Sequence, residues 1–383
     1  MSTALPELQL TRTDDLPWSA RMANAMIRRH PPEQTRWHYE HGLLLMAIGR
    51  VGQVSGDPSY GRFVRTAIDP FIGPDGTIRT YRIEEYNLDQ INPGKLLFAL
   101  YRETGDARYR RALALLREQL RGHPRTHSGG LWHKQIYPFQ MWLDGIYMAS
   151  PFYAEYGRTF GEPEAFDDVA HQIELLEERT RDPQTGLLYH AWDESRLQRW
   201  ADPETGCSPH FWGRAVGWYA MALVDTLDLF PADHPRRPAI QAILGRLAEA
   251  VVRVQDPVSG LWFQVLDQGK RPGNYLEASA SCMLVYALAR GVRQGYLPAQ
   301  FAAPARAAYA GILRELVGVD AQGLVSLERV CAVAGLGGDP YRDGSFAYYV
   351  GEAVRANDYK GVGPFILASL ELEQTLPGDG VGR

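Results

Sequence analysis

Cysteine is scarce in this sequence, and long apolar runs are missing from it. The three cysteines, Cys207, Cys282 and Cys331, are far apart and odd in number. This spacing argues against a disulfide framework and predicts a reducing, cytoplasmic location. No stretch is apolar for long enough to predict a membrane span, and residues 1–21 lack the apolar centre of a signal peptide.

Clusters of one charge sign are also missing. Charged residues make up 22% of the chain, acidic and basic residues are intermixed, and the net charge is −5. Without a basic arm, the sequence predicts neither a nucleic acid nor an anionic membrane surface as a partner. Aromatic residues are plentiful by contrast, with 20 Tyr, 13 Phe and 9 Trp, and many lie beside Asp, His or Arg. Such groups suit the apolar faces of sugar rings, although they also serve plain core packing.

Alternation of apolar and polar residues, which is typical of strands, is rare, and helical patterns alternate with loops of similar sequence. Apolar spacing predicts helices over 14–29, 36–51, 60–68, 92–103, 107–121, about 138–157, 164–179, 213–230, 237–254, 276–290, 301–316, 348–356 and 363–373. A Gly-Leu-apolar loop follows every second helix, at Gly130, Gly186, Gly260 and Gly323, with a weaker copy at Gly76. Helix pairs repeated about six times predict a closed ring of six inner and six outer helices, with an open solenoid as the alternative. We expect one domain over residues 1–383, with an ordered core of about 14–375 and a frayed tail at 377–380.

The inner helices of this ring should be the more apolar ones, which follow the Gly-Leu loops. The loops that carry Trp132, His133, His190 and Trp262 would then meet at one mouth of the ring. We therefore expect the chemistry of the protein at that mouth.

Asp144 stands out because it interrupts a stretch that is apolar nearly all round, Trp-Leu-Asp-Gly-Ile-Tyr-Met over residues 142–148. A carboxylate in a buried helix must be paired, hydrogen-bonded or kept neutral, since burying a free charge is very costly. Asp144 is thus either a structural residue, tied to backbone amides or an arginine, or a catalytic carboxyl.

Four more polar residues are candidates, and each has a plain structural alternative. Asp89 lies just ahead of a helix and could be its N-cap. His133 and Lys134 precede the helix of Asp144, and His190 lies in the next loop. Either histidine could simply be a solvated loop residue.

Arg214 lies between Trp212 and Trp218 in Phe-Trp-Gly-Arg-Ala-Val-Gly-Trp, residues 211–218. An arginine among aromatic rings can stack and still fork to a carboxylate, which would belong either to a structural Asp or to a substrate. In the ring all these residues share one end, so the sequence predicts a pocket for a small acidic sugar. Asp89 and Asp144 would suit acid/base work in that pocket.

A metal site is the competing hypothesis. Cys207 and His210 could form half of a zinc site, but no second close Cys/His pair follows them. The sequence also has neither a Walker-type phosphate loop nor a Gly-x-Ser-x-Gly elbow. We therefore expect no metal and no cofactor.

With these motifs in hand, the chain resembles the unsaturated rhamnogalacturonyl hydrolases of glycoside hydrolase family 105. The similarity runs from about Trp37 to Glu373 and is concentrated at residues 137–152, 188–195, 211–223, 275–281, 341–350 and 357–368. It implies an all-α (α/α)6 barrel. It also implies removal of a 4,5-unsaturated uronic acid from the non-reducing end of lyase-generated oligosaccharides, by hydration of the C4=C5 double bond.

The resemblance also implies roles for individual residues. Asp144 would donate the proton and then act as the base that activates water, Asp89 would be the second carboxylate, and His190 would lie near the attacking water. The substrate-binding positions would be Tyr39, His133, Lys134, Trp142, Trp212, Arg214 and Trp218. Val216 stands where the family pattern suggests a polar residue, which bears on substrate detail.

Two alternative functions stay open at this point. One is an unsaturated glucuronyl hydrolase that acts on ulvan- or glycosaminoglycan-type products. The other is a non-hydrolytic toroid, either a sugar-binding protein or an epimerase. For the favoured function the partner is an acidic oligosaccharide, and the protein would be a monomer or a small homo-oligomer.

Overall fold

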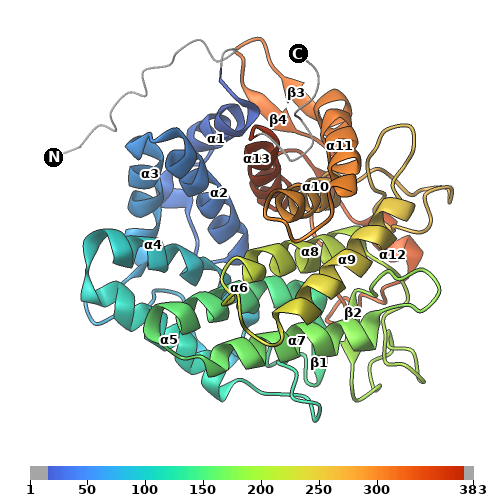
Figure 1. The fold of residues 1–383 in the computed structure, drawn as a ribbon, viewed down its shortest axis with the longest axis horizontal. Helices are drawn as coiled ribbons and strands as arrows, with labels where there is room; N and C mark the ends of the chain where they lie inside the picture. The colour runs from blue at the N-terminus through green and yellow to red at the C-terminus, as the bar shows by residue number, and fades with distance from the viewer. Residues whose placement is uncertain (1–15, 375–383) are drawn as a thin grey trace.

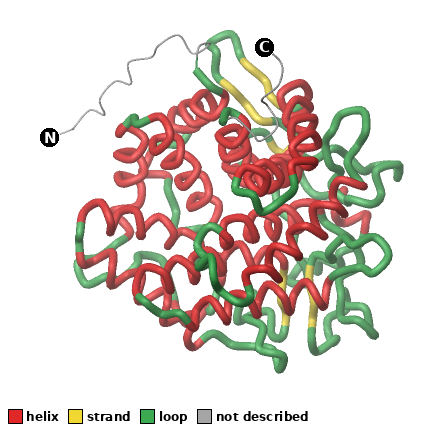
Figure 2. Tube along the Cα trace, viewed as in Figure 1, coloured by secondary structure: helices red, strands yellow, loops and turns green. Residues whose placement is uncertain are grey.

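The computed structural model describes residues 16–374 as a toroid of helices with only short strands at its edges (Figures 1 and 2). The inner helices are α2 (Tyr39–Ser55), α4 (Lys95–Thr104), α6 (Leu143–Phe160), α8 (Gly213–Leu227), α10 (Ala278–Arg293) and α13 (Tyr359–Leu372). The outer helices are α1 (Trp18–Arg29), α3 (Pro58–Ile68), α5 (Ala107–Gly122), α7 (Glu164–Thr180), α9 (Arg237–Arg253) and α11 (Ala302–Glu315).

The ring closes on itself. Each inner helix contacts the next in chain order, and α13 packs against α2. Each outer helix covers one inner helix, and α1 lies beside α13, so that the blue and red ends of the chain meet in Figure 1. This is the (α/α)6 arrangement predicted from the repeats, and the open solenoid is excluded.

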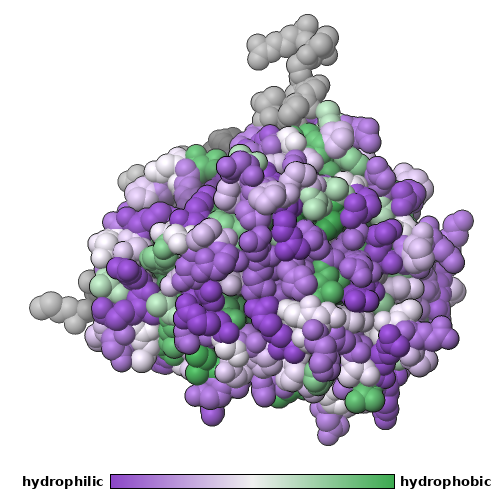
Figure 3. Space-filling view, turned by 60° about the horizontal axis from the view of Figure 1, so that its bottom comes forward, coloured by the Kyte–Doolittle hydropathy of each residue, from purple (hydrophilic) through white to green (hydrophobic). Residues whose placement is uncertain are grey.

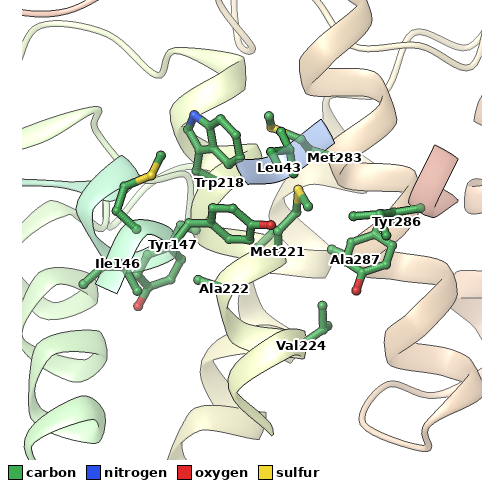
Figure 4. Close-up of a cluster of buried hydrophobic side chains, with 14 of the residues drawn as sticks. Leu43, Ile146, Tyr147, Trp218, Met221, Ala222, Val224, Met283, Tyr286 and Ala287 are labelled. Carbon is green, nitrogen blue, oxygen red and sulfur yellow. The ribbon is translucent and has the colours of Figure 1, made fainter. Parts of the chain in front are cut away.

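The inner helices are apolar on nearly all sides because both their faces are covered. Leu43, Tyr147, Trp218, Met221 and Met283 come from four of them and fill the middle of the ring (Figure 4). We call these five residues the apolar plug; each is at most 1% exposed. By contrast, the outer face shown in Figure 3 is largely hydrophilic, with apolar residues scattered over it.

The Gly-Leu loops recur because they close in the same way. Gly186 and Gly260 donate their N–H groups to the carbonyls of Asp182 and Asp256, at 2.8 Å in both cases. Both glycines have φ near +75°, at +75° and +78°, a conformation that a side chain would strain. The loops end by directing the chain into the next inner helix. The N-terminal ends of the inner helices therefore share one end of the ring.

In two segments the structure forms a strand where the sequence predicted a helix. The central helix begins at Leu143 rather than near Pro138, because β1 (Gln140–Trp142) pairs antiparallel with β2 (Ala191–Asp193). The segment predicted as a helix over 348–356 is divided into α12 (Phe346–Gly351) and β6 (Val354–Arg355), and β6 pairs with β5 (Val330–Cys331). The remaining strands, β3 (Val317–Val319) and β4 (Val325–Leu327), form a hairpin. The predicted helix opening at Asp14 and the tail at 377–380 lie outside the described residues.

Cys207, Cys282 and Cys331 are all buried and free of disulfides. Between residues 16 and 374, no helix combines the length and the apolar character that crossing a membrane would require.

Candidate active site

Pairing of β1 with β2 brings Asp144 to His190. Trp142 is the register partner of Ala191, and the N–H of Leu143 donates to the carbonyl of His190 at 3.0 Å. Asp144 follows this junction in the first turn of α6, where the helix dipole favours a carboxylate. As a result, Asp144 Oδ2 lies 3.3 Å from His190 Nε2.

The Asp144 carboxyl is almost enclosed, yet one of its oxygens has no hydrogen-bond partner among the described residues. Its side chain is 14% exposed, and Oδ2 makes no hydrogen bond to any residue that the structure describes. Neither backbone amides nor an arginine hold this oxygen, as the structural alternative would require. A buried carboxyl oxygen and a buried imidazole nitrogen that both lack a hydrogen-bond partner anywhere in residues 16–374 are rare in a structural role, and they mark this pair as a candidate for function.

His190 is completely buried rather than solvated. Its Nδ1 lies 2.8 Å from the hydroxyl of Tyr349, on α12. If the Tyr349 hydroxyl donates to Nδ1, the ring proton is on Nε2, the nitrogen that faces Asp144; if Nδ1 donates, Nε2 is an acceptor there. The sequence prediction missed Tyr349, because nothing in the local pattern around residue 349 indicates contact with a histidine 159 positions away.

Asp89 forms a second buried carboxylate site. It is 5% exposed, and it lies 2.6 Å from Lys134 Nζ and 3.6 Å from His133 Nε2. Burial alone would raise its pKa, but the charges of Lys134 and His133 hold the pKa of Asp89 below its usual value. The helix-cap alternative is wrong, since Asn87 accepts the local N–H and the carboxylate of Asp89 points to Lys134 instead.

His133 is also buried, at 3% exposure, and not a solvated loop residue. Burial lowers its pKa to about 4, although Asp89 opposes this shift, so the ring is neutral at pH 7. Lys134 responds in the opposite direction: burial lowers its pKa, but Asp89 raises it further, and the net shift is upward. The charged pair at this site is therefore Asp89 with Lys134.

Three tryptophans build the wall between these groups. Trp142 stacks on His133 with 4.6 Å between ring centroids, and Trp212 packs on His190 at 4.7 Å. Trp218 stacks on Tyr147 at 4.8 Å. These tryptophans are 5%, 1% and 1% exposed, so their rings hold the polar groups in place and keep water away from them.

Arg214 is a positioned cation without a carboxylate partner. Its Nη1 donates to the carbonyl of Cys331 and, at 3.4 Å, to Ser279 Oγ. Glu277 fixes both acceptors, since it hydrogen-bonds Ser279 Oγ at 2.8 Å and the Cys331 N–H at 2.8 Å. Within residues 16–374, no carboxylate comes within ion-pair distance of Arg214. Its predicted structural Asp partner is therefore absent from the described part of the chain.

Tyr39, the first residue of α2, connects these groups. Burial raises the pKa of its hydroxyl well above 10, and the charges of Glu40, Asp89 and Asp144 add to this shift while Arg214 opposes it. Its ring meets Trp218 edge-on, with centroids 6.1 Å apart. All the site residues predicted from the sequence thus lie at the N-terminal end of the inner helices.

The competing zinc hypothesis finds no support at Cys207 and His210. Cys207 Sγ contacts the carbonyl of Arg179 at 3.1 Å, and His210 Nδ1 lies 3.1 Å from Gln268 Nε2. Over residues 16–374, no three His, Cys, Asp or Glu side chains are arranged to hold a metal ion.

Known proteins resemble the whole of this chain. A solved structure of a family 105 glycoside hydrolase from C. acetobutylicum is 49% identical, with a TM-score of 0.91 over 94% of this chain and 99% of that chain. The unsaturated rhamnogalacturonyl hydrolase YesR of Bacillus subtilis is 30% identical over 66% of this chain and 70% of its own length. An unsaturated glucuronyl hydrolase from a Bacillus species is 14% identical with a TM-score of 0.68, over 93% of this chain and 95% of that chain, which shows a shared fold.

These similarities agree with the match to a family profile. The profile of Glycosyl Hydrolase Family 88 covers residues 18–376, nearly the full length of the chain. The resemblance to family 105 noted in the sequence is confirmed by the C. acetobutylicum structure. The chain therefore belongs to Glycosyl Hydrolase Family 88, within the unsaturated uronyl hydrolases, and is a glycoside hydrolase.

Proposed function

We propose that this enzyme releases a 4,5-unsaturated uronic acid from the non-reducing end of unsaturated rhamnogalacturonides, by hydrating the C4=C5 double bond. The observation that carries the proposal is the enclosed Asp144 carboxyl, whose Oδ2 lies 3.3 Å from His190 and has no hydrogen-bond partner among the described residues. Arg214 lies at the same end of the ring and has no carboxylate within ion-pair distance among residues 16–374. The similarity to YesR favours rhamnogalacturonides as the substrate class. The three free, buried cysteines favour a cytoplasmic location.

The chemistry follows from the structure of the sugar. The double bond is part of an enol ether, so a proton added to C4 leaves a cation at C5 that the ring oxygen shares. Water adds at C5, loses a proton and gives a hemiketal. Opening of the hemiketal forms a ketone at C5 and turns C1 into a hemiacetal, which releases the remaining oligosaccharide. One water molecule is consumed, and the glycosidic oxygen is never protonated in the first step, unlike in the usual two-carboxylate scheme.

Each site residue has a task in this sequence of steps. Asp144 would deliver the proton to C4 and then take one from the water, with His190 orienting that water through Nε2. Asp89, kept ionised by Lys134, would accept hydrogen bonds from sugar hydroxyls. Arg214 would hold the substrate carboxylate, because it is a buried cation that lacks one. Tyr39, His133 and the three tryptophans would enclose the ring, and the closed wall would exclude bulk water.

The test is a panel of lyase-generated disaccharides from rhamnogalacturonan, ulvan and glycosaminoglycans. Hydration removes the ultraviolet absorbance of the enol ether, so turnover appears as a decay of that band. We expect decay with the rhamnogalacturonan product and a loss of about 10²- to 10⁴-fold in Asp144→Asn, the range for removing a general acid. The matched control is Asp167→Asn, an isosteric change in the first turn of α7 where the side chain is 66% exposed. It should leave the rate unchanged.

The outcomes separate the remaining candidates. Decay confined to ulvan or glycosaminoglycan products would replace the substrate class but keep the reaction. Sugar isomers in the NMR spectrum without loss of the double bond would indicate an epimerase. Binding of the disaccharides without any turnover would indicate a sugar-binding protein and refute the proposal.

A further inference from the structure

A cavity of about 540 Å³ lies at the end of the ring opposite the candidate active site. Its lining comes from residues 46–53, 151–158, 286–290 and 367–371 in the C-terminal halves of four inner helices, and from residues 95–103, nearly all of the short helix α4. The active-site residues lie in the first two turns of α2, α6 and α8 or in the loops that precede inner helices. The volume falls in the range of about 300–1,000 Å³ that is typical of small-molecule sites.

Five of the charged groups that line this cavity are already paired with one another. Arg102 Nη1 lies 2.7 Å from Glu155, and Arg290 binds both Asp228 and, at 2.6 Å, Glu371. Acidic and basic side chains thus largely cancel around the cavity wall. The wall therefore has little excess charge of its own with which to attract an ion.

Lys95 differs from these paired groups. Its Nζ is buried, lies 3.9 Å above the ring of Tyr147, and has no hydrogen-bond partner in the described part of the chain. Burial lowers the pKa of Lys95 to about 8, although Asp225 and Glu155 oppose the shift. An ammonium group has three donors, and leaving them unused in a buried place is destabilising. The cavity therefore contains a donor that lacks an acceptor.

An acceptor with spare capacity lies on a neighbouring helix. Asp225, on α8, also lines the cavity and accepts one hydrogen bond, from the Tyr286 hydroxyl at 2.6 Å. A carboxylate has room for several such bonds. Lys95 and Asp225 do not bond to each other, so a molecule between them could serve both.

We propose that this cavity is a second binding site, and that it takes a neutral monosaccharide. Neighbouring hydroxyls on a sugar ring can accept from the Lys95 ammonium and donate to the Asp225 carboxylate at the same time. Tyr286 lines the same cavity and offers an aromatic surface to the C–H face of the ring. An anionic sugar is disfavoured, because six carboxylates and five basic side chains line the wall without an excess of positive charge, and the C-terminal ends of four inner helices carry partial negative charge.

The experiment titrates the full-length protein with L-rhamnose, D-galactose, D-glucose and D-galacturonate, with binding followed by saturation-transfer NMR and calorimetry. At least one neutral sugar should bind saturably, and its affinity should fall tenfold or more in Lys95→Met. Methionine keeps an unbranched apolar chain and removes only the unpartnered charge, so the fold should persist. Ala99→Phe is a second variant that fills the cavity from α4 and should abolish binding. Arg214→Lys, at the opposite end of the ring, should leave this binding unchanged.

Three results would overturn the proposal. One is the absence of saturable binding by any of the three neutral sugars. Another is binding that survives in both Lys95→Met and Ala99→Phe but is lost in Arg214→Lys, which would place the sugar in the active site. The third is saturable binding of galacturonate alone. If Lys95→Met does not fold, Ala99→Phe and a crystal soaked in the neutral sugar decide the question by themselves.

Discussion

Replacing Lys134 with methionine tests whether the Asp89 site is held by a buried ion pair. Asp89 is 5% exposed, and its charged partner, Lys134 Nζ, lies 2.6 Å away. His133 lies at 3.6 Å but is neutral at pH 7, because burial lowers its pKa to about 4. Lys134→Met therefore leaves a buried carboxylate without a cation.

Breaking a buried pair in this way costs about 3–5 kcal/mol of the free energy of unfolding. The Lys134 side chain is still 23% exposed, so we expect a value near the lower end, about 3 kcal/mol. Urea unfolding at pH 7, followed by circular dichroism, measures it. The control is Arg82→Met, which removes one member of an exposed pair whose side chains are 74% and 49% exposed. Such pairs contribute at most about 1 kcal/mol.

The stability deficit of Lys134→Met should also depend on pH in a definite direction. In the wild type the pKa of Asp89 is lowered, so its ion pair stabilises the fold above the unfolded value of about 3.9 and this contribution is lost as the pH falls. In Lys134→Met the largest of the effects that oppose burial is gone, so we expect burial to dominate and the folded pKa of Asp89 to rise above the unfolded one. The carboxylate then destabilises the fold at neutral pH, and the deficit should shrink between pH 7 and pH 5.

A double variant closes the argument. Asp89→Asn combined with Lys134→Met removes the charge that was left alone, so it should be more stable at pH 7 than Lys134→Met by itself. A deficit of less than about 1 kcal/mol in the single variant, equal at both pH values, would refute the reasoning from burial.

Three further predictions concern single side chains. Tyr349→Phe removes the hydroxyl 2.8 Å from His190 Nδ1. Since one hydrogen bond contributes about 1 kcal/mol, this variant should lower kcat about tenfold with little change in KM. An unchanged kcat–pH profile in the absorbance assay would contradict the prediction. Arg214→Lys keeps the charge but loses the planar fork, and it should raise KM for the unsaturated disaccharide by about tenfold or more, which initial-rate kinetics would show. His123 is buried and its pKa is lowered to about 4. The unfolded chain therefore binds a proton below about pH 6.5 that the folded chain does not bind, and the free energy of unfolding should fall from pH 6.5 to pH 4. Urea titrations should show a shallower fall in His123→Gln.

How much of the fold could be predicted depends on the range of the interactions. The helices α3, α5, α7 and α9 were predicted to within two residues at both ends, because a helix is specified by apolar residues three and four positions apart. The Gly-Leu loops could be predicted equally well, since their hydrogen bonds join residues only four positions apart, as between Gly186 and Asp182. The start of α6 was predicted wrongly, because the pairing of Trp142 with Ala191 joins positions 49 residues apart.

The candidate site, like the fold, could be predicted from the sequence only in part. The sequence by itself determined which residues carry unusual chemistry: an Asp in an apolar helix, an Arg between tryptophans, and histidines in the loops before inner helices. Only the tertiary structure decided what each of them faces. It joined Asp89 to Lys134, placed Tyr349 behind His190, left Arg214 without a carboxylate, and set Lys95 in a cavity at the far end. The physical reason is that composition and periodicity act within one helix, whereas burial and pairing depend on segments that meet only when the ring closes.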